Sequence, residues 1–487
     1  MEMNTPHQEK KLQFVEYTRE RFKAMFGWIK IMVADTAKKF KKIGKDDPRR
    51  IVHSMKVGLA LTLVSLFYYF RPLYDGFGQA GMWAVLTVVV VFEFTVGGTL
   101  SKSINRGCAT LVAGALGVGA EYLAGLCGEK GEPIVLGILV FILASTSTFM
   151  RFFPHVKRRY DYGVLIFILT FSLVAVSGFR VTQILQLAHQ RLSTILIGGA
   201  TCMIISIFVW PVWAGQDLHN LIATNIENLG SFLEGFGGEF FNFPGSGNCT
   251  VSSKDDDVSF LKSYKSVLNS KATEESLANF AWWEPAHGRF RFHHPWKQYL
   301  KISVLARECA CQIETLNSLI NSKPKVALEF HAKIQQPCTK LSTESGKALK
   351  ELATAIKNMT YPSSAVQSHI ENSKAAADDI KSILENSSLP TKADLQEIMP
   401  VLVTASVLID NIKCIEKISV SVLELSQMAR FLEPKSTDGL EKQQQLLHRG
   451  IVKPVDDVIV KDDDRVVIEI TPKDSIAREK AGVNIKF

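Results

Sequence analysis

Apolar residues are concentrated between Val57 and Trp213, whereas the rest of the 487-residue chain is predominantly polar. A helix that spans a bilayer needs roughly 20 mostly apolar residues. Six segments approach that length, and several of them need flanking residues to complete a span. They are Val57–Phe70, Met82–Val96, Ala109–Leu126, Ile134–Phe149, Gly163–Phe179 and Leu192–Trp210. The pattern predicts a membrane domain over residues 51–214 with six transmembrane helices per subunit.

Beyond residue 214 the apolar positions form stripes with a spacing of three to four residues. One stripe consists of Ile302, Leu305, Cys309, Ile313, Leu316 and Ile320. The other consists of Leu408, Ile412, Ile415, Ile418, Val422, Leu425, Ala429 and Leu432. One-sided stripes predict amphipathic helices, so residues 215–435 are assigned to a cytosolic helical bundle. The stripes form either the bundle core, which we favour, or an oligomer interface.

Three polar or glycine-containing segments are typical of loops or linkers, namely Gly237–Gly238, Asn242–Asp257 and Glu433–Gln443. Residues 436–487 form a C-terminal tail, in which Val455–Ile470 fits either a strand or an extension. The predicted fold class is therefore all-α, a polytopic membrane protein with a helical domain.

The first 50 residues form a basic arm with 13 Lys and Arg and without the apolar core of a signal peptide. Its apolar residues recur at roughly helical spacing, at Phe14, Phe22, Met25, Phe26, Ile29, Met32 and Val33. The arm fits either a basic amphipathic helix on an anionic membrane surface or a helix packed on the soluble part.

The distribution of Lys and Arg between the links predicts that both termini are cytosolic. The basic links are the N-terminal arm, the second-to-third link with Lys102 and Arg106, and the fourth-to-fifth link, 151–159. The net charge of +8 then reflects topology. No zinc finger or RNA-binding motif supports a nucleic-acid partner.

The sequence contains no recognisable enzyme or metal motif. Its eight cysteines are scattered, and Cys309 and Cys311 point to different faces of a helix, which disfavours zinc. His287, His293 and His294 occur without a nucleophile motif or a phosphate loop. We therefore expect neither a cofactor nor an enzymatic activity.

Charged residues at the edges of apolar segments are the candidates for function. Arg106 and Arg191 each stand at the start of a predicted span, where a cation is costly unless it snorkels, pairs or faces a water-filled path. A path lined by these arginines would attract anions and repel cations. The alternative is snorkelling toward lipid headgroups.

Two carboxylates also lie at or within the predicted spans. Glu93 is expected to pair with Lys102 or Arg106, and Asp161 with the neighbouring Arg158 and Arg159. Three residues at the start of the second span, Met82, Trp83 and Leu86, are either an apolar gate or helix-packing residues.

Several ungapped runs resemble one plant family. In the membrane half they are 82–94, Asn105-Arg106-Gly107, 151–154, 160–163, 177–180, 191–194 and 210–215, and in the soluble half 283–288 and 294–296. The chain, over about residues 46–435, is similar to the aluminium-activated malate transporters. The resemblance implies a homodimer with six transmembrane helices per subunit and a cytosolic helical domain. It also implies an anion channel for malate, chloride and nitrate, whose path is lined by Arg106, Arg191 and Lys102.

The chain departs from this family at its outer acidic residues. Asp75 retains the first of them, but Thr182 and Gln186 lie in a second loop that lacks carboxylates. A trivalent hard cation needs clustered anionic oxygens, so we expect a channel that aluminium does not activate.

The family's regulatory stretch for γ-aminobutyrate corresponds to Phe208–His219. Here Trp213 and Asp217 are kept, whereas Gln216 replaces the family's acidic residue. The prediction is thus a malate and inorganic-anion channel in contact with membrane lipid, in the plasma membrane rather than the vacuolar membrane. A coupled exporter of organic or aromatic acids is the alternative.

Overall fold

The computed structural model describes residues 6–69, 81–178, 184–241, 260–322, 328–386 and 392–432, which all belong to one compact unit, Met1–Pro434. These residues are almost entirely helical and contain no β-strand, only two isolated bridges, His287–Phe290 and Thr360–Leu432. The all-α prediction is confirmed for this part of the chain.

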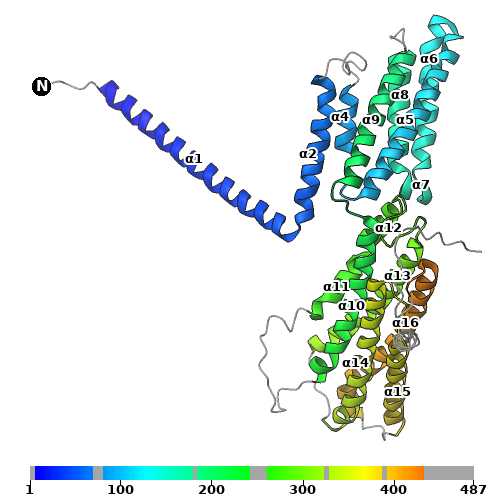
Figure 1. The fold of residues 1–487 in the computed structure, drawn as a ribbon. Helices are drawn as coiled ribbons and strands as arrows, with labels where there is room; N and C mark the ends of the chain where they lie inside the picture. The colour runs from blue at the N-terminus through cyan, green and yellow to red at the C-terminus, as the bar shows by residue number, and fades with distance from the viewer. Residues whose placement is uncertain are drawn as a thin grey trace, which may run out of the picture. The chain divides into compact units, whose positions relative to one another are not determined.

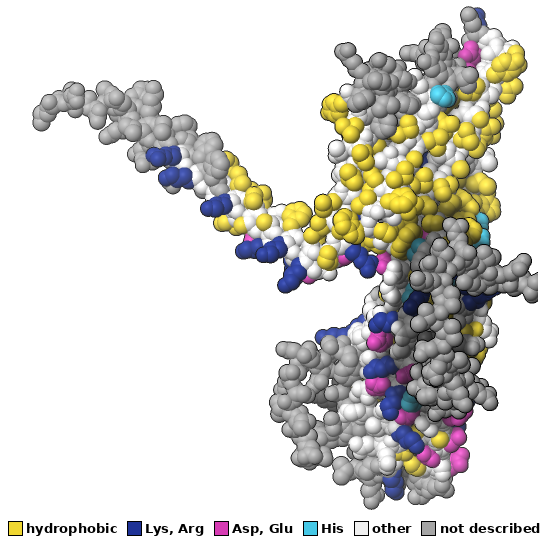
Figure 2. All heavy atoms as spheres, in the orientation of Figure 1, with side chains coloured by type: hydrophobic (Ala, Val, Ile, Leu, Met, Phe, Trp, Pro, Cys, Tyr) yellow, Lys and Arg dark blue, Asp and Glu magenta, His cyan; other side chains and the backbone are white. Residues whose placement is uncertain are grey.

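A long N-terminal helix, α1 (Pro6–Asp46), precedes a group of apolar helices that lie side by side in Figure 1. They are α2 (Pro48–Tyr69), α4 (Met82–Val91), α5 (Val96–Gly125), α6 (Gly128–Met150), the short α7 (Pro154–Arg159), α8 (Asp161–Gly178) and α9 (Ile184–Phe208). The visible surface of this group is largely apolar (Figure 2). Such a surface is stable against lipid rather than water.

Three described helices are long and apolar enough to cross a membrane, over Val96–Gly125, Lys130–Met150 and His189–Phe208. Two further apolar helices are shorter, Met82–Val91 and Asp161–Val176. Each of the six predicted segments coincides at least partly with a helix, but the boundaries differ between the second and third segments.

The predicted segment Met82–Val96 is not one helix. α4 ends at Val91, Phe92 is extended, and α5 starts at Val96 instead of near Ala109. Thr95 caps α5, since its hydroxyl accepts a hydrogen bond from Gly98 N at 3.2 Å. Residues 82–96 are apolar except for Thr87, Glu93 and Thr95, so composition alone does not reveal this break. As a result, Lys102 and Arg106 lie inside α5 and not in a link between helices.

The remaining helices form a second bundle. They are α10 (Ala214–Phe241), α11 (Phe260–Asn269), α12 (Lys271–Ala281), α13 (Trp296–Ser322), α14 (Leu328–Asn358), α15 (Ser364–Asn386) and α16 (Lys392–Ala429). The two apolar stripes are buried in its core, with Leu305 and Ile320 partly buried and Leu432 exposed. The core interpretation is thus confirmed for most positions.

The predicted loop at Gly237–Gly238 is wrong, because α10 continues through both glycines. A Cβ on Gly237 would lie 3.1 Å from Thr339 Cα, so this glycine permits the close approach of α14. The other two predicted loops and the C-terminal tail lie outside the described residues.

Candidate functional site

Two of the predicted pore cations lie on one face of α5, where they surround Tyr162. Lys102 and Arg106 are four positions apart, the spacing that places helical side chains on the same face. The Lys102 Nζ lies 5.7 Å from the centre of the Tyr162 ring, and the Arg106 Nη1 donates to the Tyr162 hydroxyl at 3.2 Å. We call Glu93, Lys102, Arg106 and Tyr162 the Tyr162 cluster.

Arg106 is buried without a carboxylate partner among the described residues. Only 3% of it is exposed, and its Nε has no hydrogen-bond partner in the described part of the chain. The hydroxyls of Ser103 and Thr110, three residues before and four after it, are likewise buried without a partner there. A polar strip of donors with a cation at its centre therefore runs along an otherwise apolar helix.

Lys102 differs from Arg106 because its charge is already compensated. Its ammonium forms an ion pair with Glu93, which lies in the non-helical segment between α4 and α5. Both side chains are about one-third exposed. Glu93 thus contacts Lys102, one of the two cations expected to pair with it. This ion pair holds the non-helical segment between α4 and α5 against α5.

Arg191 lies on the ring of Trp83, one of the three residues expected to be either an apolar gate or helix-packing residues. Its guanidinium carbon is 4.7 Å from the ring centre, which is a cation–π contact between α9 and α4. No carboxylate within the described residues pairs with Arg191, and its Nε has no partner among them. Met82 and Leu86, the other two of these three residues, are exposed on the single chain, at 66% and 45%.

Asp161 pairs with Arg151, so the expected pairing with Arg158 and Arg159 is wrong. The Arg151 guanidinium donates to both carboxylate oxygens, at 2.7 and 3.2 Å. Arg159 instead lies on the ring of Trp282, at 4.1 Å from its centre. The short helix α7 turns the chain so that the beginning of α8 lies beside the end of α6.

The predicted regulatory stretch lines a pocket of about 350 Å³. Its walls are Pro48, Arg49, Val52, Trp210, Pro211, Val212, Trp213, Gln216 and Asp217. Asp217 forms an ion pair with Arg49 at 2.9 Å, and so joins the start of α10 to the start of α2. Trp213 also stacks on the His287 ring, with 3.8 Å between centres.

Glu284 is a central residue that the sequence reasoning missed. Its buried carboxylate accepts hydrogen bonds from Gly97 N at 3.2 Å, Ala214 N at 2.6 Å and Gly215 N at 3.0 Å. It therefore caps the first turns of α5 and α10 together, where helix dipoles favour an anion. Burial raises the pKa of this carboxyl above its ordinary value, while the three amides oppose that shift. The motif 283–288 pointed here only through the family resemblance.

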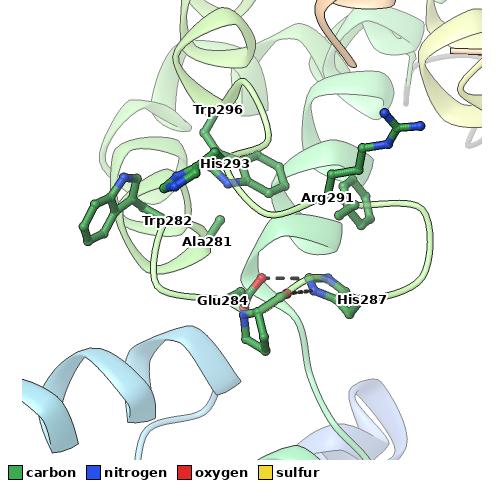
Figure 3. Close-up of a pocket in the computed structure, with 9 residues that line it drawn as sticks. Ala281, Trp282, Glu284, His287, Arg291, His293 and Trp296 are labelled. Atoms are coloured by element: carbon green, nitrogen blue, oxygen red, sulfur yellow. Dashed lines mark hydrogen bonds and ion pairs between the residues drawn. The ribbon is translucent and has the colours of Figure 1, made fainter. Parts of the chain in front are cut away.

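Figure 3 shows the residues that line a small space beside Glu284. His287 Nδ1 donates to the Pro285 carbonyl at 2.9 Å, and its Nε2 lies 3.9 Å from the carboxylate. The space lined by Glu284, His287 and Trp296 has a volume of only about 10 Å³, which is room for a single water. The arrangement is a structural junction between helices rather than a substrate pocket.

The side chains at the three positions considered for aluminium are not described by the structure. Asp75 and Thr182 lie outside the described residues, and Gln186 lies in α9 with a side chain that is not described. Among the described residues, no group of three or more His, Cys, Asp or Glu is arranged to hold a metal ion.

The described helices and side chains define a helical membrane protein with basic residues inside its apolar helices. A family model described as "Aluminium activated malate transporter" matches residues 41–394. This match covers most of the chain, which therefore belongs to the aluminium-activated malate transporter family.

Individual relatives agree with this assignment. The chain is 53% identical to Aluminum-activated malate transporter 2 of Arabidopsis thaliana over 403 residues, 83% of this chain and 80% of the relative. It is 50% identical to transporter 1 of the same plant over 85% of this chain and 84% of the relative. Transporter 1 of Triticum aestivum is 45% identical over 88% of this chain and 92% of the relative.

Proposed function

We propose that this protein is an anion channel that conducts malate and inorganic anions across a plant membrane. It acts as a homodimer with six transmembrane helices per subunit and a cytosolic bundle formed by α10–α16. Both termini are cytosolic, and the plasma membrane is its location. The relatives are named as malate transporters, which supports the substrate class and argues against an enzyme.

The observation that carries this proposal is Arg106, a buried cation without a carboxylate partner among the described residues. An unpaired charge in a low-dielectric setting is strongly unfavourable, so such a residue needs a counter-charge or a polar path. Arginine stays protonated at any working pH, and its planar fork can hold a carboxylate through two hydrogen bonds. A permeating dicarboxylate supplies that counter-charge.

Arg191 forms a second station on α9. Its contact with Trp83 leaves the edge of the guanidinium able to donate hydrogen bonds, because the ring covers only one face. Two successive sites of moderate strength suit conduction better than one tight site, since a tightly bound anion leaves slowly. Trp83 is then the aromatic residue that orients Arg191, whereas Met82 and Leu86 are available for packing against lipid or a second subunit.

The decisive experiment is a two-electrode recording of reversal potentials in malate, nitrate and chloride. Wild type is compared with Arg106→Gln and Arg191→Gln, and with exposed Arg158→Gln as the matched control. We expect both pore variants to lose at least tenfold in malate conductance, while Arg158→Gln keeps the wild-type selectivity. A wild-type reversal potential that does not shift when malate, nitrate or chloride is exchanged would contradict the proposal. Unchanged currents in both pore variants would contradict it as well.

We further propose that aluminium does not activate this channel. The support is the chemistry of the loop that contains Thr182, because a trivalent cation binds neutral oxygens much more weakly than carboxylates. Replacing Thr182 and Gln186 with glutamate should create aluminium-dependent current at acidic pH, compared with asparagine replacements. Wild-type current that rises on adding aluminium would contradict this part of the proposal.

A further inference from the structure

The helix α1 exposes a long apolar face. Eight large apolar side chains between Met25 and Ile43 are each more than one-third exposed. Ile31 lies away from the others around the helix, and the remaining seven are Met25, Trp28, Ile29, Met32, Val33, Phe40 and Ile43. Their steps of three, four and seven residues place them on one side of the helix. In Figure 2 the apolar side chains of α1 lie along one edge, and the basic ones lie along the opposite edge.

The same stretch is strongly basic. Residues 25–46 contain six lysines, all exposed, and only two acidic residues, Asp35 and Asp46. The lysines are Lys30, Lys38, Lys39, Lys41, Lys42 and Lys45. Asp35 forms a long surface ion pair with Lys38 at 3.8 Å, which leaves the positive excess in place.

We propose that α1 lies along the membrane surface, with its apolar face in the headgroup boundary and its lysines at anionic lipid headgroups. A helix of this composition, amphipathic with five of its six lysines outside the apolar face and Lys39 near its edge, is suited to that interface. Each lysine near an anionic leaflet strengthens partitioning by roughly fivefold at moderate salt. The partner is an anionic lipid surface, and this inference is independent of which ion the channel conducts.

The connection to α2 places α1 at the membrane boundary. Only Asp47 separates the end of α1 from Pro48, the first residue of α2. α2 itself carries an exposed apolar stripe at Ile51, Met55, Leu59, Leu63 and Leu66. Such a stripe suits contact with lipid. Because α1 ends where this apolar helix begins, the same lipid is within reach of the apolar face of α1.

A second copy of α1 fits this face less well. The stretch 25–46 has four more lysines than acidic residues, so two paired copies would bring their lysine borders together. Like charges at a helix–helix interface oppose association, whereas an anionic headgroup layer compensates them. The charge pattern therefore favours lipid over self-association.

The test uses the full-length protein in nanodiscs with a fluorescent amino acid at Phe40, or at Lys41 on the polar side as the matched control. Quenching by lipids with brominated acyl chains is measured in phosphatidylcholine alone and with about 30% phosphatidylglycerol. At position 40 we expect at least threefold stronger quenching with the anionic lipid, and at position 41 little change. The variant with Gln at Lys38, Lys42 and Lys45 should reduce quenching to the phosphatidylcholine level.

Two results would overturn the proposal. Equal quenching in both lipid compositions would show that the lysines do not attract this helix to the bilayer. Absence of lipid quenching, together with protection of position 40 from aqueous iodide, would show that protein covers the apolar face. Anion currents recorded from the same preparations keep this outcome separate from the proposed channel activity.

Discussion

Tyr162 connects the two cations of α5 in different ways. Its ring faces the ammonium of Lys102, while its hydroxyl accepts from Arg106. Glu93 compensates Lys102 but makes no ion pair with Arg106. One cation of the cluster thus has a carboxylate partner, whereas the other has none among the described residues.

Replacing Glu93 with Gln should release the charge of Lys102 beside Arg106. The carboxylate no longer repels anions, so the half-saturating malate concentration should fall severalfold, with the effect weakening at high salt. Concentration–current curves at two ionic strengths measure this. The double variant Glu93→Gln/Lys102→Gln is the control and should return toward the wild-type value. A rise in the half-saturating concentration in the single variant would refute the assignment.

For single residues, the sequence predicted which charged side chains stand out better than it predicted which side chains they contact. A cation at the edge of an apolar run is costly, so Arg106 and Arg191 could be singled out as candidates without coordinates. Their contacts could not, because Tyr162 and Trp83 lie far away along the chain. Asp161 illustrates the limit, since the nearest cations in sequence are not the one that it binds.

At the scale of elements, Glu284 links the first turns of α5 and α10 with one carboxylate. The two glycines that donate to it, Gly97 and Gly215, are also sites of close approach. A Cβ on Gly97 would lie 2.9 Å from Glu284 Cγ and clash with the Phe280 carbonyl, and one on Gly215 would lie 2.5 Å from Trp296 Cη2. Helix α5, which carries the Tyr162 cluster, is therefore held by the loop that follows α12.

Gly97→Ala should destabilise this junction by about 1–3 kcal/mol, because backbone atoms cannot move aside without shifting a helix. We expect a lower unfolding temperature of the purified full-length protein and a reduced current per molecule at the surface. Gly119→Ala, in the same helix with open space at its Cβ, is the matched control and should change little. Equal unfolding temperatures for the two variants would contradict a tight junction.

Apolar composition identified the helices, but it could not locate their ends. The run from Met82 to Phe94 is apolar almost throughout, and only Thr87 and Glu93 interrupt it. Three contacts accompany the break at Phe92–Thr95. The first is the Thr95 cap. In the other two, the Val96 amide donates a hydrogen bond to the Val212 carbonyl at 2.9 Å, and the Gly97 amide donates one to the Glu284 carboxylate. Two of these three contacts come from segments more than a hundred residues away.

For the molecule as a whole, the second bundle contains a hydrogen-bonded group that limits its stability in acid. His219 Nδ1 and His294 Nε2 both contact the Tyr299 hydroxyl, at 2.9 and 3.3 Å. Burial lowers the pKa of each histidine to about 4. The folded bundle thus keeps both imidazoles neutral at a pH where an exposed histidine is charged.

The sign of the pH dependence follows from this difference. An unfolded histidine takes up a proton near pH 6.5, whereas the folded ones resist protonation until about pH 4. The unfolded state therefore binds more protons in this interval, and stability falls as the pH decreases, by about 1 kcal/mol per histidine at pH 5.5.

His294→Phe should lower the unfolding temperature at pH 7.5. On going from pH 7.5 to pH 5.5, however, the unfolding temperature of this variant should fall less than that of wild type. Exposed His189→Gln serves as the control and should keep the wild-type acid loss, measured by thermal unfolding of the purified full-length protein. An acid loss in His294→Phe as large as that of wild type would mean that other groups dominate the acid sensitivity of the bundle.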